Sequence, residues 1–275
     1  MINIMFPNGC TKAFTLSYDD GVTQDKRLVK IFNTYRLKAT FNLNSSLQNE
    51  RNNWIGKNDT FICRMNIDEL EQVYLGHEIA VHSLTHPHLE LLPPYEAYRE
   101  LYEDKKNLEL LFAEIVRGMA YPYGTYNDKI KHINKMIGLN YCRTVNSTCR
   151  FDPPGDFLEW NPTCHHSYSE LFSLAQDFIE ASPDKLSIFY VWGHSYEFDE
   201  DDNWDMIEKF SSFISGKEDI WYATNGQIYD YITAANRLVL SADSAIVYNP
   251  TDISIWLRTH NKAVEVQSGQ TIAIV

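Results

Sequence analysis

Two patterns of apolar and polar positions alternate along this chain. Short, nearly continuous apolar runs are followed by longer segments in which apolar residues recur every three or four positions. The first such pair is "KAFTLSY" (12–18) followed by "TQDKRLVKIFNTYR" (23–36). The short run is typical of a buried strand, and the spacing of three to four is typical of a helix. The pattern therefore predicts a strand–helix unit.

Similar units follow along the chain. The same patterns predict strands at 38–44, 77–83, 116–121, 140–145, 185–194 and 220–226, and helices at 66–76, 94–114, 126–138, 167–181, 201–215 and 227–237. Seven or eight such units indicate a parallel sheet covered by helices. We expect an α/β fold, a deformed (β/α)7-8 TIM-like barrel. The alternative is an open doubly wound sheet, but no G-x-G-x-x-G follows the first strand, which disfavours a dinucleotide fold.

The pattern changes near residue 237. Residues 237–275 have short alternating runs separated by turn residues, without a helical period. Such a stretch predicts a few antiparallel strands. The expected organisation is a barrel over residues 1–236 and a small C-terminal antiparallel β appendage over residues 237–275.

Composition and charge narrow the class of protein. The net charge of −13 disfavours nucleic acid as a partner. No apolar run approaches the length of about 18 residues that spans a bilayer, so we expect no integral membrane association. Five cysteines without a C-x-x-C favour buried free thiols over disulfides or a zinc–thiolate site. The opening "MINIMFPNGC" lacks a signal-peptide pattern, which predicts a cytoplasmic protein or, alternatively, a trimmed secreted chain.

Chemically useful side chains follow several predicted strands. Asp19 and Asp20 follow the first strand, His82 lies at the end of 77–83 with His86 just beyond it, and His194 ends 185–194. Barrels of this kind place their sites at the carboxyl ends of the strands. Two histidines and one carboxylate leave coordination positions open, as catalytic metal sites require. The same ligands occur in non-haem iron oxygenases, but the strand–helix alternation argues against their all-β fold.

These segments also resemble a known family. "YDDG" (18–21), "HSLTH" (82–86), "YPYG" (121–124), Trp160 and "WGH" (192–194) look like the motif series of polysaccharide deacetylases, the NodB homology domain of carbohydrate esterase family 4. The resemblance covers about residues 10–235. It implies a divalent metal, most often Zn²⁺, with Co²⁺, Ni²⁺ or Fe²⁺ as alternatives. It assigns Asp20, His82 and His86 as metal ligands, Asp19 as general base, His194 as general acid and the Tyr123 backbone N–H as an oxyanion donor.

The resemblance also implies a substrate surface, and the chain departs from the family pattern beside it. Trp160 is expected to line the groove, with Tyr121 and Pro122 as further substrate-binding residues. The family often has an arginine where this chain has Ala120, so Arg117 or Arg143 is expected to replace it. The fourth motif is only loosely present, as "GDFLEW". The acidic run "EFDEDD" (197–202) is interpreted as a solvated helix start.

The function expected from these features is removal of acetyl groups from a carbohydrate. Hydrolysis of an N-acetyl group is favoured over that of an O-acetyl group, which makes the chain a hydrolase of carbon–nitrogen bonds other than peptide bonds. The alternatives are a metal-dependent hydrolase of a different small amide and a catalytically inactive carbohydrate-binding homologue. Asp19 and His194 argue against the inactive homologue, because binding alone needs neither residue.

Overall fold

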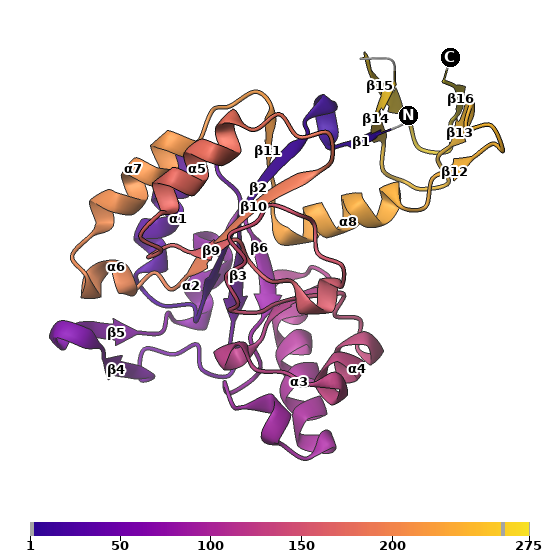
Figure 1. Cartoon of the computed structure of the whole chain (residues 1–275). Coiled ribbons are helices and arrows are strands. Elements are labelled where there is room, and N and C mark those ends of the chain that lie inside the picture. Colours follow the sequence, from indigo (N-terminus) through magenta and orange to yellow (C-terminus); the bar gives the residue numbers. More distant parts are fainter. Residues whose placement is uncertain (1–2, 260–261, 275) are drawn as a thin grey trace.

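A curled parallel sheet forms the centre of the computed structural model, which describes residues 3–259 and 262–274 (Figure 1). Its strand order is β8-β7-β6-β3-β2-β10-β9, and β11 also pairs with β2. The strands of this sheet are β2 (Lys12–Asp19), β3 (Ala39–Leu43), β6 (Glu78–Val81), β7 (Gly118–Ala120), β8 (Tyr141–Arg143), β9 (Cys164–His165), β10 (Ser187–Gly193) and β11 (Ile220–Tyr222).

One extended segment joins the two outer strands of this sheet. Trp160 forms a parallel bridge with Arg143 of β8, where its backbone N–H donates to Cys142 O at 2.9 Å. Five residues later, His165 of β9 pairs with Trp192 of β10. The run from 160 to 165 therefore closes the ring of strands. This closure confirms the predicted deformed barrel and excludes the open doubly wound sheet.

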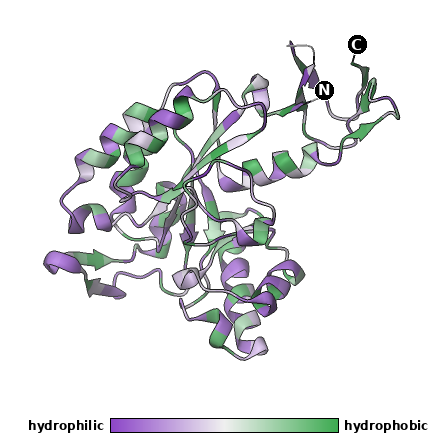
Figure 2. Ribbon diagram, viewed as in Figure 1, coloured by the Kyte–Doolittle hydropathy of each residue, from purple (hydrophilic) through white to green (hydrophobic). Residues whose placement is uncertain are grey.

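Helices cover the outside of the barrel, and Figure 2 shows mainly hydrophobic strands beneath helices with mixed faces. One helix covers the end where the strands begin. At its start Asn225 accepts a hydrogen bond from Thr15 inside the barrel at 2.8 Å, and Thr224 forms a capping box with Gln227. The helices are α1 (Asp25–Thr34), α2 (Ile67–Val73), α3 (Pro94–Phe112), α4 (Asp128–Met136), α5 (Leu171–Glu180), α6 (Glu197–Glu200), α7 (Trp204–Ile214) and α8 (Asn225–Ala235), the last being the one that covers this end.

The side chains of β2 alternate between the two faces of the sheet. Phe14, Leu16 and Tyr18 pack outward among the helices, whereas Ser17 and Asp19 lie inside the barrel. Successive strand residues point to opposite faces, so this order follows directly from the sequence. The barrel interior is therefore polar toward the carboxyl ends of the strands, which is where the candidate residues lie.

A hairpin that the sequence did not predict projects from the loop after β3. It consists of β4 (Asn53–Ile55) and β5 (Phe61–Cys63), which pair antiparallel. Figure 1 shows it beside α6. The hairpin therefore extends the rim of the barrel on that side.

The C-terminal region forms two small antiparallel sheets, as the alternating pattern predicted. Their orders are β1-β14-β15 and β12-β13-β16, and they pack on α8, where Tyr231 OH donates to Met5 O at 2.6 Å. The N-terminal strand thus joins the appendage, which the boundary at residue 237 did not foresee. The strands are β1 (Asn3–Met5), β12 (Val239–Leu240), β13 (Ile246–Tyr248), β14 (Ile255–Thr259), β15 (Lys262–Val266) and β16 (Thr271–Ala273).

The structure also bears on the expectations about cysteines and membrane spans. All five cysteines are free, and only Cys149 is exposed. Within 3–259 and 262–274, no helix combines the length and the apolar character needed to cross a bilayer.

Candidate metal and catalytic site

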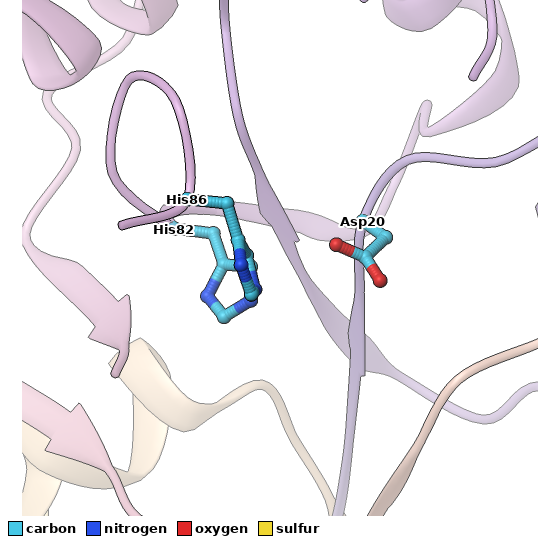
Figure 3. Close-up of side chains that lie close together, drawn as sticks. All are labelled: Asp20, His82 and His86. Atoms are coloured by element: carbon cyan, nitrogen blue, oxygen red, sulfur yellow. The ribbon is translucent and has the colours of Figure 1, made fainter. Parts of the chain in front are cut away.

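Three predicted ligands meet at the carboxyl ends of β2 and β6 (Figure 3). One ligand atom each from Asp20, His82 and His86 lies within 4.8 Å of the other two, and the two Nε2 atoms are 3.1 Å apart. His82 Nδ1 is 2.8 Å from the carbonyl oxygen of Ala120, so this nitrogen must donate. The lone pair of His82 Nε2 is then directed toward His86. This donor set fits a divalent cation, and the carbonyl contact fixes the tautomer as it does around many metal-bound histidines.

The backbone turns sharply at the ligands. Asp20 has a φ of 84° and Gly21 a φ of 64°, so the chain leaves β2 through the left-handed region. A Cβ at Gly21 would lie 2.6 Å from the Gln48 side chain, so glycine is required there on two grounds. His86 also has a positive φ, of 59°. Such backbone strain is found mainly where function demands it.

A buried arginine holds the carboxylate ligand. Arg64 Nη2 lies 2.9 Å from Asp20 Oδ1, and Nη1 donates to the Asp20 carbonyl and to Asn44 Oδ1. Burial alone raises the pKa of Asp20, but the guanidinium of Arg64 and the neighbouring histidines outweigh burial and lower this pKa. Asp20 is therefore ionised and oriented before any cation binds.

Helix α3 positions the histidine loop. Asp104 accepts hydrogen bonds from the backbone N–H of His82 at 3.1 Å and of Ser45 at 2.6 Å. One turn earlier, Glu100 accepts from the N–H and the hydroxyl of Thr85, both at 2.8 Å. Residues spaced by four on one helix thus hold both ends of the ligand segment.

The expected general base lies inside the barrel. Asp19 Oδ1 accepts a hydrogen bond from Asn42 Nδ2 at 2.8 Å, and Oδ2 forms an ion pair with Arg143. Burial raises the pKa of Asp19, but Arg143 and the histidines of the site outweigh it and lower this pKa. Asp19 Oδ2 also lies 3.8 Å from both His82 Nε2 and His194 Nε2.

The structure distinguishes the two candidate replacement arginines. Arg117 forms a bidentate pair with Asp230 of α8, at 2.5 and 2.6 Å, on the side of the barrel where the strands begin. Arg143 is the residue beside Asp19. Asn42 was not predicted as a site residue. It lies directly opposite Asp19 in the β2–β3 register. Because it follows Thr40 by two positions, its side chain lies on the same face of β3 as that of Thr40.

The expected general acid has a carboxylate partner. His194 Nδ1 is 3.3 Å from Glu197 Oε1, and the His194 backbone N–H donates to Glu197 Oε2 at 3.1 Å. Burial lowers the pKa of His194, but the hydrogen bond to Glu197 and the charges of Asp19 and Glu197 outweigh burial and raise it to about 9. The acidic run at 197–202 was interpreted as a solvated helix start. That interpretation is wrong for Glu197, which lies at the site.

Two more imidazoles contact the same carboxylate. His165 Nε2 and His166 Nε2 lie 3.1 and 3.2 Å from Glu197 Oε2. These three side chains are close enough to hold a cation. However, the Ser167 N–H donates to His165 Nδ1, so His165 Nε2 carries a proton and donates to Glu197. The carboxylate of Glu197 thus accepts hydrogen bonds from several imidazoles. These donors lower the pKa of Glu197 despite its burial.

The expected substrate surface is not where the resemblance placed it. Trp160 is 2% exposed and packs on Tyr190, 4.8 Å between ring centroids, because the bridge to β8 draws it into the core. Tyr121 and Pro122 are also buried, and Tyr121 OH donates to Leu158 O. The structure therefore contradicts stacking of a sugar on Trp160, Tyr121 or Pro122. Tyr123 is 54% exposed at the rim, with its ring 4.6 Å from that of His86.

The fold and the site together define a barrel of the carbohydrate esterase family 4 type. A family model described as polysaccharide deacetylase matches residues 7–142, and the chain belongs to this family of carbohydrate deacetylases, the NodB homology group. The family match places the chain among hydrolases that remove acetyl groups from carbohydrates. No curated protein sequence matches the chain significantly.

Solved structures agree on the fold. A putative polysaccharide deacetylase from Mycobacterium smegmatis is 15% identical with a TM-score of 0.60, over 85% of this chain and 94% of that one. A family 4 carbohydrate esterase from Streptomyces lividans is 15% identical with a TM-score of 0.51, over 78% and 93%. The chain spans 61% of the Streptococcus pyogenes deacetylase PplD, at 22% identity and a TM-score of 0.46.

Proposed function

We propose that this protein removes acetyl groups from a carbohydrate with the help of a divalent metal, Zn²⁺ first among the candidates, held by Asp20, His82 and His86. N-acetyl groups are the preferred substrate over O-acetyl groups. The observation that supports this most is the position of Asp19. Its Oδ2 lies 3.8 Å from His82 Nε2 at the ligand set and 3.8 Å from His194 Nε2.

Each protein group has a part in the proposed reaction. When bound, the metal would polarise the acetyl carbonyl and acidify a water molecule. Asp19, ionised and held by Asn42 and Arg143, accepts the proton of the attacking water. The Tyr123 N–H donates to the oxyanion of the tetrahedral intermediate.

The leaving group takes its proton from the side opposite Asp19. His194, kept protonated by Glu197, donates a proton to the departing nitrogen. Protonation matters most for an amine, because an unprotonated amide nitrogen is a poor leaving group. The raised pKa of His194 therefore supports N-acetyl hydrolysis over O-acetyl hydrolysis.

Metal analysis and acetate release test this proposal together. We expect the wild-type protein to bind one equivalent of metal and to release acetate from the N-acetylated chitooligosaccharide or peptidoglycan more readily than from the O-acetylated acetylxylan. Asp19→Asn is expected to retain the metal and lose roughly 10²–10⁴-fold in turnover. Asp20→Ala is expected to lose the metal itself.

Other outcomes separate the alternatives. Full turnover by Asp19→Asn would remove Asp19 from the role of base. Acetate release from acetylxylan alone would assign O-acetyl hydrolysis. Metal binding without acetate release from any carbohydrate would favour a different small amide, and carbohydrate binding without any turnover would favour an inactive homologue.

A further inference from the structure

Two aromatic rings extend outward from the proton donor. The ring of Tyr196 lies 5.1 Å from that of His194, and Trp54 of β4 meets Tyr196 edge to face, at 5.7 Å and 84°. Both rings are partly exposed. If the proposed function holds, the departing sugar lies on this side, because it receives the proton of His194. The two rings therefore lie next to the position of the leaving group.

We propose that Trp54 and Tyr196, whose rings are nearly perpendicular, form an aromatic corner, called the platform below, and that a sugar ring of the substrate stacks on one of its two ring faces. This sugar is neutral or carries an amino group. Sugar rings present C–H groups on their faces, which pack well on aromatic rings, while their hydroxyl groups remain at the edge. Tryptophan combines a large apolar face with an N–H donor, which suits such a ligand. The platform rests on the proposed function only for its position relative to the reacting bond.

The hairpin that carries Trp54 is held firmly to α6. Glu200 Oε1 accepts the Lys57 N–H at 2.7 Å, and the Glu200 carbonyl accepts Asn58 Nδ2 at 2.7 Å. A Cβ at Gly56 would lie 2.1 Å from Glu200 Oε1, so a larger residue there would displace the Glu200 side chain. Gln24 adds bonds to the Phe61 carbonyl and to Asp199. The position of Trp54 is therefore fixed by the helix that also carries Glu197.

Trp54 is also connected to the metal ligands. The guanidinium carbon of Arg64 lies 5.5 Å from the Trp54 ring centroid, while Arg64 Nη2 contacts Asp20 at 2.9 Å. One buried arginine thus spaces the aromatic ring from the carboxylate ligand. This spacing gives the platform a constant distance from the reacting bond, as a subsite for a defined sugar unit requires.

The charge around the platform restricts the sugar. Helix α6 and the turn after it carry Glu197, Asp199, Glu200, Asp201 and Asp202, of which Asp199, Asp201 and Asp202 are exposed. Their negative potential disfavours uronate or phosphate groups on the substrate. A neutral acetylated sugar is tolerated, and a neighbouring deacetylated unit with its ammonium group is attracted. Amino-sugar chains therefore fit this side better than acidic polysaccharides.

Substitution of Trp54 tests the platform, and its neighbour supplies the matched control. Ile55 is 61% exposed and follows Trp54 in β4, so its side chain points to the other face of the hairpin. Binding of chitooligosaccharide to the Asp19→Asn protein is measured by calorimetry, with Trp54→Ala, Trp54→Phe or Ile55→Ala added. We expect about tenfold weaker binding for Trp54→Ala, partial rescue by Trp54→Phe and no change for Ile55→Ala.

Turnover of two substrates distinguishes stacking from a structural role. In the otherwise wild-type protein, Trp54→Ala is expected to raise KM for chitooligosaccharide far more than KM for para-nitrophenyl acetate, whereas Ile55→Ala is expected to change neither. Unchanged chitooligosaccharide binding by Trp54→Ala would overturn the platform, as would an equal loss on both substrates. A preference for acetylated polyuronate would overturn the assignment of the sugar. Trp54-dependent binding without any acetate release would refute the proposed function and leave the platform standing.

Discussion

Arg143 and Asp19 form a buried ion pair across the carboxyl end of the barrel, although 124 residues separate them in the chain. Their side chains are 1% and 3% exposed. A buried charge without a partner is costly, so each of these residues stabilises the ionised form of the other. The pair thus keeps a carboxylate anionic at the point where the proposed reaction needs a base.

Replacing Arg143 is expected to change how the rate depends on pH. Without the guanidinium, the pKa of Asp19 rises, so the base is protonated over more of the acid range. In Arg143→Met, the acid limb of the kcat/KM profile should move to higher pH, and turnover near neutral pH should fall roughly 10–100-fold. Arg117→Met, which removes a pair at the other end of the barrel, serves as the control. An unmoved acid limb in Arg143→Met would argue that Asp19 is not the base.

Glu197 is expected to control the alkaline limb. Its carboxylate raises the pKa of His194 to about 9, so the acid stays protonated through neutral pH and loses its proton as the pH approaches that value. In Glu197→Gln the pKa of His194 should fall, and the alkaline limb should move to lower pH, relative to wild type with the same metal bound. Asp202→Asn, in the same acidic run, should leave the profile unchanged. Equal profiles for Glu197→Gln and wild type would contradict this role.

Helix α3 is expected to matter for metal affinity without touching the metal. Asp104→Asn weakens the hold on the His82 N–H, which keeps its bond to Leu43 O, and can leave the Ser45 N–H without its acceptor. An unsatisfied buried donor costs about 1–3 kcal/mol. We expect metal affinity to fall roughly 10–100-fold, as it does when groups that orient ligands are lost. Titration of the metal-free protein with Zn²⁺ measures this. Glu103→Gln, on the same helix but paired with Lys106 at the surface, should bind as wild type does.

Asp25 is expected to make stability depend on pH. It is fully buried, and its carboxyl group meets Tyr74 OH at 2.6 Å and the Ser195 hydroxyl. Burial raises its pKa from 3.8 to about 7. Its contribution to stability is therefore present below the unfolded pKa and is lost as the pH rises through about 7.

Denaturant unfolding at pH 5 and pH 8, with a chelator present, tests this dependence. The free energy of unfolding of wild type should be smaller at pH 8. Asp25→Asn should reduce the difference, by about 1.4 kcal/mol for each pH unit between pH 5 and the folded pKa of about 7. A difference as large in Asp25→Asn as in wild type would show that other groups, such as Asp104, carry it.

Much of the barrel could be predicted from the sequence because its strands are buried and its helices are amphipathic. Both properties leave a clear period in the chain, and the observed elements lie within the predicted ranges to a few residues. The β4–β5 hairpin had no such signal. Its strands are three residues each, and its position depends on Glu200, far away in the sequence.

The meeting of Asp20, His82 and His86 could also be predicted, since these residues lie just beyond the ends of strands. Trp160 shows where that reasoning fails. Its family motif placed it at a groove, but its position is decided by backbone pairing with β8, which no local pattern reveals. The prediction for Glu197 was wrong for a related reason. A charged residue in an acidic run gives no sign that three imidazoles from other parts of the fold will surround it.

The order of these residues along the chain has a consequence for synthesis. Asp20 directly follows β2, and His82 and His86 follow β6, with only β3 between those strands in the sheet. Every residue proposed to bind the cation has therefore been synthesised by position 86. Arg143 follows later, and His194 and Glu197, the proposed proton donor and its partner, come only after residues 160–165, which close the ring. The proposed ligands are thus synthesised well before the residues proposed to protonate the leaving group.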